Sequence, residues 1–144
     1  MTRPRHLEEN ILYDDEAGRQ LSEHCALRLR AAGRSTMLTF KGPRQKARSF
    51  KVREEFETAV KDRGQTKKIL RALGLKPSFS YTKHRTVLKK GRLTITLDET
   101  AVGTFIELEG ERHEITRLAK SLGFGRADFI TASYVDMIRD AREK

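Results

Sequence analysis

The sequence predicts an α+β fold with a mostly antiparallel sheet, on three observations. Six segments alternate apolar and polar residues with a period of two, which is typical of strands with one buried face. Three other segments place apolar residues three and four positions apart, as amphipathic helices do. Between them lie turn signals such as Gly42-Pro43.

The six predicted strands are rich in charged residues on their polar side. The first, 26–31, sets Leu27 and Leu29 against Arg28 and Arg30. The other predicted strands are 35–41, 48–58, 79–87, 92–98 and 103–109. We therefore expect the apolar side chains of each strand to lie on one face of the sheet and its polar side chains on the other.

The predicted helices are 65–73, 112–122 and about 127–142. The first two are followed by Gly74 and Gly123, and glycine readily ends a helix. We expect the helices to cover the apolar face of the sheet from outside. If the sheet curls into a barrel, the polar faces line a water-filled tunnel.

Composition favours a polyanionic partner. The 144 residues suggest a single domain over 1–144, with 30 Lys+Arg against 20 Asp+Glu and a net charge of +10. This charge suits nucleic acid, an anionic membrane or phosphorylated small molecules. No run approaches the ~18 apolar residues of a membrane-spanning helix, and the N-terminus does not read as a signal peptide. The single Cys25 fits a reducing compartment, so we expect a cytoplasmic location.

Acids and bases are segregated along the polar strand faces. The bases lie mostly on the early strands, and the last two strands supply Asp98, Glu107 and Glu109. The bases are Arg28, Arg30, Lys41, Arg53, Lys83 and Arg85, and the polar faces also carry Glu55 and Glu57. For any one strand, the wet side of an open sheet explains such residues. Because nearly every strand has them, we favour a site for a metal-bound polyphosphate, since guanidinium groups bind phosphate oxygens and carboxylates bind Mg²⁺ or Mn²⁺.

Several short motifs, in this order, resemble the CYTH superfamily, also called triphosphate tunnel metalloenzymes. They are HLEENILYDD, ALRLR, LTFKGP, FKVREEFE, YTKHRTV, LTITLDE, GTFIELEG, LGF and ITASYVDMI. The superfamily includes class IV (CyaB-type) adenylate cyclases, thiamine triphosphatases and inorganic triphosphatases. The resemblance implies an antiparallel β-barrel, the triphosphate tunnel, with helices packed outside.

The resemblance also implies roles for individual residues. It assigns substrate-phosphate binding to the basic residues Arg28, Arg30, Lys41, Arg53, Lys83 and Arg85. It makes Glu107 and Glu109, helped by Asp98, the catalytic carboxylates that hold Mg²⁺ or Mn²⁺. For Arg53, Glu55 and Glu57, a structural salt-bridge lattice in the tunnel and a direct role stay open as alternatives.

One departure from the family pattern concerns its opening strand. The family carries Glu-x-Glu-x-Lys there, and this chain has no such motif before HLEENILYDD. Glu8 and Glu9 are adjacent, so their side chains face opposite ways and do not replace it. We therefore expect an N-terminally incomplete domain whose first strand is missing. A truncated gene start and a degenerate member that forms a homodimer across the unpaired edge stay open as explanations.

The function expected from these residues is divalent-metal-dependent hydrolysis of an inorganic or organic triphosphate, such as tripolyphosphate, ATP or thiamine triphosphate. The first alternative is a class IV adenylate cyclase that makes cAMP from ATP. The second is a catalytically impaired protein that binds polyphosphate or nucleotides. An RNA-binding β domain is disfavoured, because Phe79 and Tyr81 make a thin stacking platform. Neither a nucleic acid nor a membrane is an expected partner.

Overall fold

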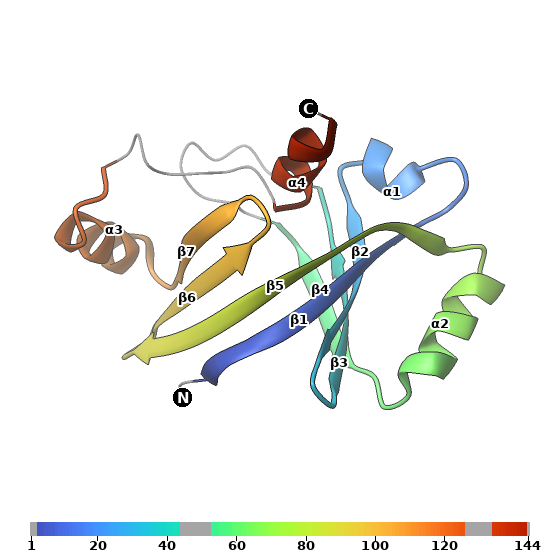
Figure 1. The fold of residues 1–144 in the computed structure, drawn as a ribbon, viewed down its shortest axis with the longest axis horizontal. Coiled ribbons are helices and arrows are strands. Elements are labelled where there is room, and N and C mark those ends of the chain that lie inside the picture. Colours follow the sequence, from blue (N-terminus) through green and yellow to red (C-terminus); the bar gives the residue numbers. More distant parts are fainter. Residues whose placement is uncertain (1–2, 44–52, 126–133, 144) are drawn as a thin grey trace. The chain divides into compact units, whose positions relative to one another are not determined.

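The computed structural model describes residues 3–43, 53–125 and 134–143 (Figure 1). Along the chain, the helices and strands are β1 (Arg3–Asp14), α1 (Arg19–Ser22), β2 (Ala26–Ala32), β3 (Ser35–Lys41), β4 (Glu55–Ala59), α2 (Arg63–Ala72), β5 (Lys76–Lys90), β6 (Leu93–Thr100), β7 (Gly103–Glu109), α3 (Arg112–Ser121) and α4 (Tyr134–Glu143). In the described part of the chain, no helix is long and apolar enough to cross a membrane.

The strands form one seven-stranded sheet in the order β4-β3-β2-β1-β5-β6-β7. Every strand pair whose register is given is antiparallel. The α+β class with an antiparallel sheet is therefore confirmed. The chain divides into two compact units, residues 8–82 and residues 1–7 with 83–144, which are described separately. The prediction of a single domain over 1–144 stays a prediction.

The unit of residues 8–82 has its core on one face of β1, β2 and β3. Tyr13, Leu29 and Leu70 are buried together, and Leu70 comes from α2. The half-buried residues packed against them are Ile11, Leu27, Leu38, Val60 and Leu75. Helix α2 begins at Asp62, whose Oδ1 accepts a hydrogen bond from the Gln65 backbone N–H at 2.9 Å. The predicted packing of an amphipathic helix on an apolar strand face is thus confirmed for this unit.

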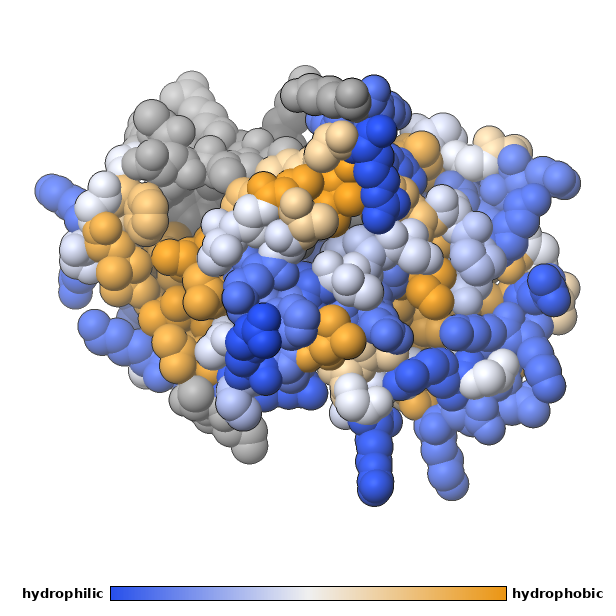
Figure 2. Space-filling view, in the orientation of Figure 1, coloured by the Kyte–Doolittle hydropathy of each residue, from blue (hydrophilic) through white to orange (hydrophobic). Residues whose placement is uncertain are grey.

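In the unit of residues 1–7 and 83–144, the better buried face of β6 is its polar one. Asp98 and Thr96 are buried, whereas the large side chains Leu88, Leu97 and Ile106 are exposed. Figure 2 shows apolar side chains at the surface where Figure 1 draws β6 and β7. A sheet that buries its polar face must satisfy those polar groups internally, which puts hydrogen bonds and ion pairs at that face.

The strand predictions for 26–31, 35–41 and 103–109 match β2, β3 and β7 closely. Those for 79–87 and 92–98 are right in place, although β5 is longer at both ends and β6 extends to Thr100. For 48–58, residues 48–52 lie outside the described residues, residues 53 and 54 are not in a strand, and β4 confirms the prediction from Glu55 onward. Residues 127–133 of the last predicted helix also lie outside the described residues. The predicted helices 65–73 and 112–122 appear as α2 and α3.

Strand β1 has no counterpart among the segments predicted from alternation. Pro4 and the adjacent Glu8 and Glu9 break the alternation that marks a strand. Nevertheless β1 lies in the interior of the sheet, with β2 and β5 as neighbours. Its pairing with β2 places Asn10 opposite Arg30 and Tyr13 opposite Leu27. Pairing partners on both sides therefore stabilise a strand whose own sequence signal is weak.

Candidate functional site

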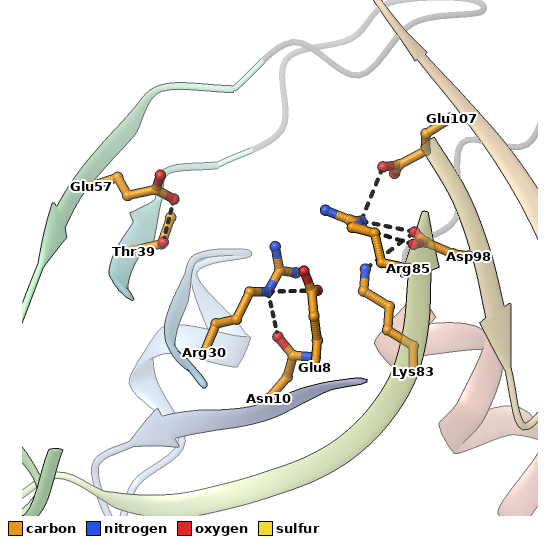
Figure 3. Close-up of polar contacts among 9 residues, drawn as sticks. All are labelled: Glu8, Asn10, Arg30, Thr39, Glu57, Lys83, Arg85, Asp98 and Glu107. Atoms are coloured by element: carbon orange, nitrogen blue, oxygen red, sulfur yellow. Dashed lines mark hydrogen bonds and ion pairs between the residues drawn. The ribbon is translucent and has the colours of Figure 1, made fainter. Parts of the chain in front are cut away.

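Arg30 is the best-anchored base on the polar face of the unit of residues 8–82. It alternates along β2 with the core residue Leu29, so its side chain lies on the other face. Its Nε donates to Asn10 Oδ1 at 2.7 Å and lies 3.1 Å from Glu8 Oε1 (Figure 3). Glu8 and Asn10 are both buried. The unit thus holds a largely buried guanidinium whose Nε donates one hydrogen bond to Asn10 and forms an ion pair with Glu8, both on β1.

Arg28 occupies the same face of β2, two residues before Arg30. Its backbone neighbour on β3 is Thr39, a fully buried residue whose hydroxyl donates to Glu57 Oε2 at 2.7 Å (Figure 3). Arg28 Nε is buried without a hydrogen-bond acceptor among the described residues. A buried charged donor without an acceptor is costly, so this position suits an anionic ligand.

The remaining predicted bases of this unit differ in their contacts. Lys41 Nζ lies 3.6 Å from Glu55 Oε1, and Glu55 is exposed. Arg53 donates from Nε to the carbonyl oxygen of Gly42 and from Nη2 to that of His24, each at 2.8 Å. Arg53 therefore ties two loop backbones together, which favours the structural alternative for this residue over direct phosphate binding.

In the other unit, Asp98 connects the two predicted bases of β5. Its carboxylate accepts from Lys83 Nζ at 3.2 Å and from Arg85 Nε and Nη2 at 2.7 and 2.8 Å (Figure 3). Arg85 Nη2 also lies 3.5 Å from Glu107 Oε2. The four groups carry two positive and two negative charges, so the cluster is formally neutral. The register accounts for it, because Arg85 lies opposite Asp98 across β5 and β6.

The predicted metal ligands Glu107 and Glu109 lie two residues apart on β7, hence on one face of that strand. Among the described residues, no group of three or more His, Cys, Asp or Glu side chains is placed to hold a metal ion. Mg²⁺ is commonly bound by one or two carboxylates together with substrate phosphates, so two glutamates fit that donor set. Asp98 is engaged by Lys83 and Arg85. The metal and catalytic roles of these three carboxylates stay predictions.

The structure thus brings Lys83, Arg85, Asp98 and Glu107 together and leaves Glu109 exposed. Glu57 is bound to Thr39 rather than to a base in the described contacts. The sequence analysis did not find Glu8 or Asn10 as partners of Arg30. Only the spacing of two between positions 8 and 10 signals that they share a face, and this signal is useful only once β1 is known to be a strand.

Comparisons with known proteins agree with these observations. The model of the CYTH domain family matches residues 2–134. A Methanocaldococcus jannaschii protein named "Putative adenylate cyclase MJ0240" is 28% identical over 146 residues, covering 92% of this chain and 82% of the relative. The solved structure of a Vibrio parahaemolyticus protein described in the same words has a TM-score of 0.83 at 21% identity, covering 94% of this chain and 82% of the other.

A third relative is HpAC1 from Hippeastrum, described as a "putative adenylyl cyclase" that "reveals a dominant" triphosphatase activity. Its structure has a TM-score of 0.77 at 20% identity and covers 96% of this chain and 84% of its own. The fold of this protein is therefore the one that these solved structures share. The chain belongs to the CYTH domain family.

Proposed function

We propose that this protein is a divalent-metal-dependent enzyme that hydrolyses a triphosphate, with inorganic tripolyphosphate as the simplest substrate. The observation that carries the proposal is the buried Arg28 Nε, which has no acceptor among the described residues and lies on the same strand face as Arg30. Phosphate oxygens are the acceptors that arginine binds best. The triphosphatase activity described for HpAC1 supports hydrolysis as the reaction.

The bases perform the binding in this proposal. In the unit of residues 8–82 the candidate phosphate-binding bases are Arg28, Arg30 and Lys41; in the other unit they are Lys83 and Arg85. Asp98 holds Lys83 and Arg85 in fixed positions, so they need not reorganise when charge develops in the transition state. Arg53 is left out of the phosphate-binding set, since two of its guanidinium nitrogens donate to backbone carbonyls.

The hydrolysis itself adds water to the terminal phosphorus and breaks the terminal phosphoanhydride bond. The products are orthophosphate and the shortened diphosphate. Mg²⁺ or Mn²⁺ held by Glu107 and Glu109 would neutralise phosphate charge and polarise the reacting phosphoryl group. The cations on β2 and β5 stabilise the negative charge that builds up on the leaving diphosphate.

A second candidate is the formation of cAMP from ATP, in which the ribose 3′-hydroxyl replaces water and attacks the α-phosphate. The name of the M. jannaschii relative favours it. Both reactions use the same phosphate-binding bases, so their products distinguish them. A third outcome, metal-independent binding without turnover, would mark the protein as an impaired member of the family.

The test is phosphate release from tripolyphosphate with Mg²⁺ or Mn²⁺ and with EDTA, beside cAMP formation from ATP. Arg28→Ala should lower kcat/KM by on the order of a hundredfold, as removal of one charge-stabilising donor does. Arg34→Ala is the matched control, because Arg34 is an exposed base in the turn after β2. Equal activity of the two variants, or phosphate release that EDTA leaves unchanged, would contradict the proposal.

A further inference from the structure

We propose that Glu8 and Asn10 are positioning residues, which hold the Arg30 guanidinium in the orientation that binds phosphate oxygens. This inference rests on the proposed function, since it concerns the same triphosphate-binding face. It assigns a role to two residues of β1 to which the family resemblance gave none. Their effect on the ligand is exerted through Arg30.

The geometry of the three side chains carries the proposal. Asn10 and Arg30 are direct partners across β1 and β2, and Glu8 lies two residues along β1 on the same face. Both contacts end on one atom, Arg30 Nε, at 2.7 Å from Asn10 Oδ1 and 3.1 Å from Glu8 Oε1 (Figure 3). The first contact is a hydrogen bond and the second an ion pair, so the amide directs the Nε–H while the carboxylate holds the charge of the guanidinium beside β1.

Pre-orientation matters because an arginine side chain loses about 2 kcal/mol of conformational entropy when it is immobilised. If β1 already holds Arg30, this loss belongs to folding rather than to ligand binding. Glu8 supplies the counter-charge that a largely buried guanidinium needs before an anion arrives. Position 10 adds a second acceptor without adding a second negative charge, which would repel phosphate.

The Nδ2 group of the Asn10 amide lowers the stability of the folded protein. Because Oδ1 accepts from Arg30, the amide orientation is set, and Nδ2 is left buried without an acceptor among the described residues. A buried unsatisfied N–H costs about 1–3 kcal/mol. An apolar residue of similar size would avoid this cost but would take the hydrogen-bond acceptor from Arg30 Nε, so the amide at position 10 acts through Arg30.

The test measures the dissociation constant of tripolyphosphate by isothermal titration calorimetry, without metal. Asn10→Leu keeps the side-chain size and removes the acceptor, and it should weaken binding about tenfold, the equivalent of one hydrogen bond to a charged group. Its melting temperature should fall by no more than a few degrees, because removal of the unsatisfied Nδ2 offsets part of the lost hydrogen bond to Arg30. In the Arg30→Ala background, Asn10→Leu should have no further effect, because both changes remove the same interaction.

Thr39→Val is the matched control for this cycle. Thr39 is a buried polar residue on the same face, and its hydroxyl binds Glu57 rather than Arg30. Its effect should therefore add to that of Arg30→Ala. The double variant Glu8→Gln with Asn10→Asp exchanges the carboxylate and the amide, which keeps the net charge and an acceptor at each position. It should bind tripolyphosphate within about threefold of the wild type.

Three results would overturn the proposal: wild-type affinity of Asn10→Leu, a full additional effect of that change in the Arg30→Ala background, or an exchanged variant as weak as Asn10→Leu. If Asn10→Leu does not fold, Asn10→Ala serves in the same cycle, since it also removes the acceptor. A wild-type protein that does not bind tripolyphosphate would remove the proposed function together with this inference. Wild-type binding that is insensitive to position 10 would remove this inference alone.

Discussion

Replacement of Asp98 by Asn should be among the most destabilising single changes in the unit that contains β6. Asp98 has no exposed surface and accepts three N–H bonds from Lys83 and Arg85. The substitution keeps the shape but removes the counter-charge 3.2 Å from a Lys83 ammonium that is only 1% exposed. Breaking a buried ion pair in this way costs about 3–5 kcal/mol.

The neighbouring Glu99 offers a matched control on the same strand. Glu99 Oε2 accepts from Arg5 Nε at 2.7 Å, the same length as the bond from Arg85 Nε to Asp98 Oδ1, but the Glu99 side chain is 39% exposed. Glu99→Gln should therefore cost less than about 1 kcal/mol, as exposed pairs do. The two carboxylates lie on the same strand and accept an arginine Nε–H at the same distance. They differ in burial, and Asp98 also binds a second base, Lys83.

The assay is thermal and urea unfolding of both variants and the wild type. At about 2–4 °C per kcal/mol, Asp98→Asn should lower the melting temperature by roughly 6–20 °C, and Glu99→Gln by at most a few degrees. Lys83→Met in the Asp98→Asn background removes the buried ammonium and should recover part of the loss. Equal destabilisation by the two single variants would refute the argument that burial sets the energy of these pairs.

Three further predictions concern the unit of residues 8–82. Leu70→Ala should destabilise it by about 2–5 kcal/mol in urea unfolding, because Leu70 is buried against Tyr13 and Leu29; a loss below about 1 kcal/mol would contradict the core. Asp62→Ala should cost about 1 kcal/mol, because it removes the cap that accepts from the Gln65 N–H, and Asp62→Asn should cost less. Burial raises the pKa of Tyr13 above its ordinary value near 10, so its contribution to stability is complete below pH 10 and is lost as the pH rises through the raised pKa. Tyr13→Phe should therefore flatten the fall of the melting temperature above pH 10, and unchanged slopes would contradict this reasoning.

The strands that the sequence predicts best are those in which each residue's polarity matches its face. In β2, Leu27 and Leu29 turn to the core and Arg28 and Arg30 to the opposite face, so the period of two is visible in the chain. In β1 the period is present but hidden. Glu8 and Asn10 lie on the polar face, whereas Ile11 and Tyr13 lie on the apolar one, and Leu12 follows Ile11 without a polar residue between them.

The candidate site was predictable in its residue types and in its strand faces. The placement of Lys83 and Arg85 with Asp98 follows from alternation and from the β5–β6 register, which a short turn at Gly91 with φ of 61° sets. The partners of each base were not predictable. A carboxylate such as Asp98 can bind a metal or a base equally well by its chemistry, and only its distances to Lys83 and Arg85 show that it binds two bases here.

The sequence by itself determined the α+β class, the polar and apolar faces of most strands, and membership of the CYTH domain family. These properties are local, because they follow from a period of two or from short motifs. Only the tertiary structure decided which face of β6 is buried, that β1 lies within the sheet, and that Arg30 is held by Glu8 and Asn10. Such facts depend on the pairing of residues distant in the chain, and the register that pairs them is fixed by the packing of whole strands.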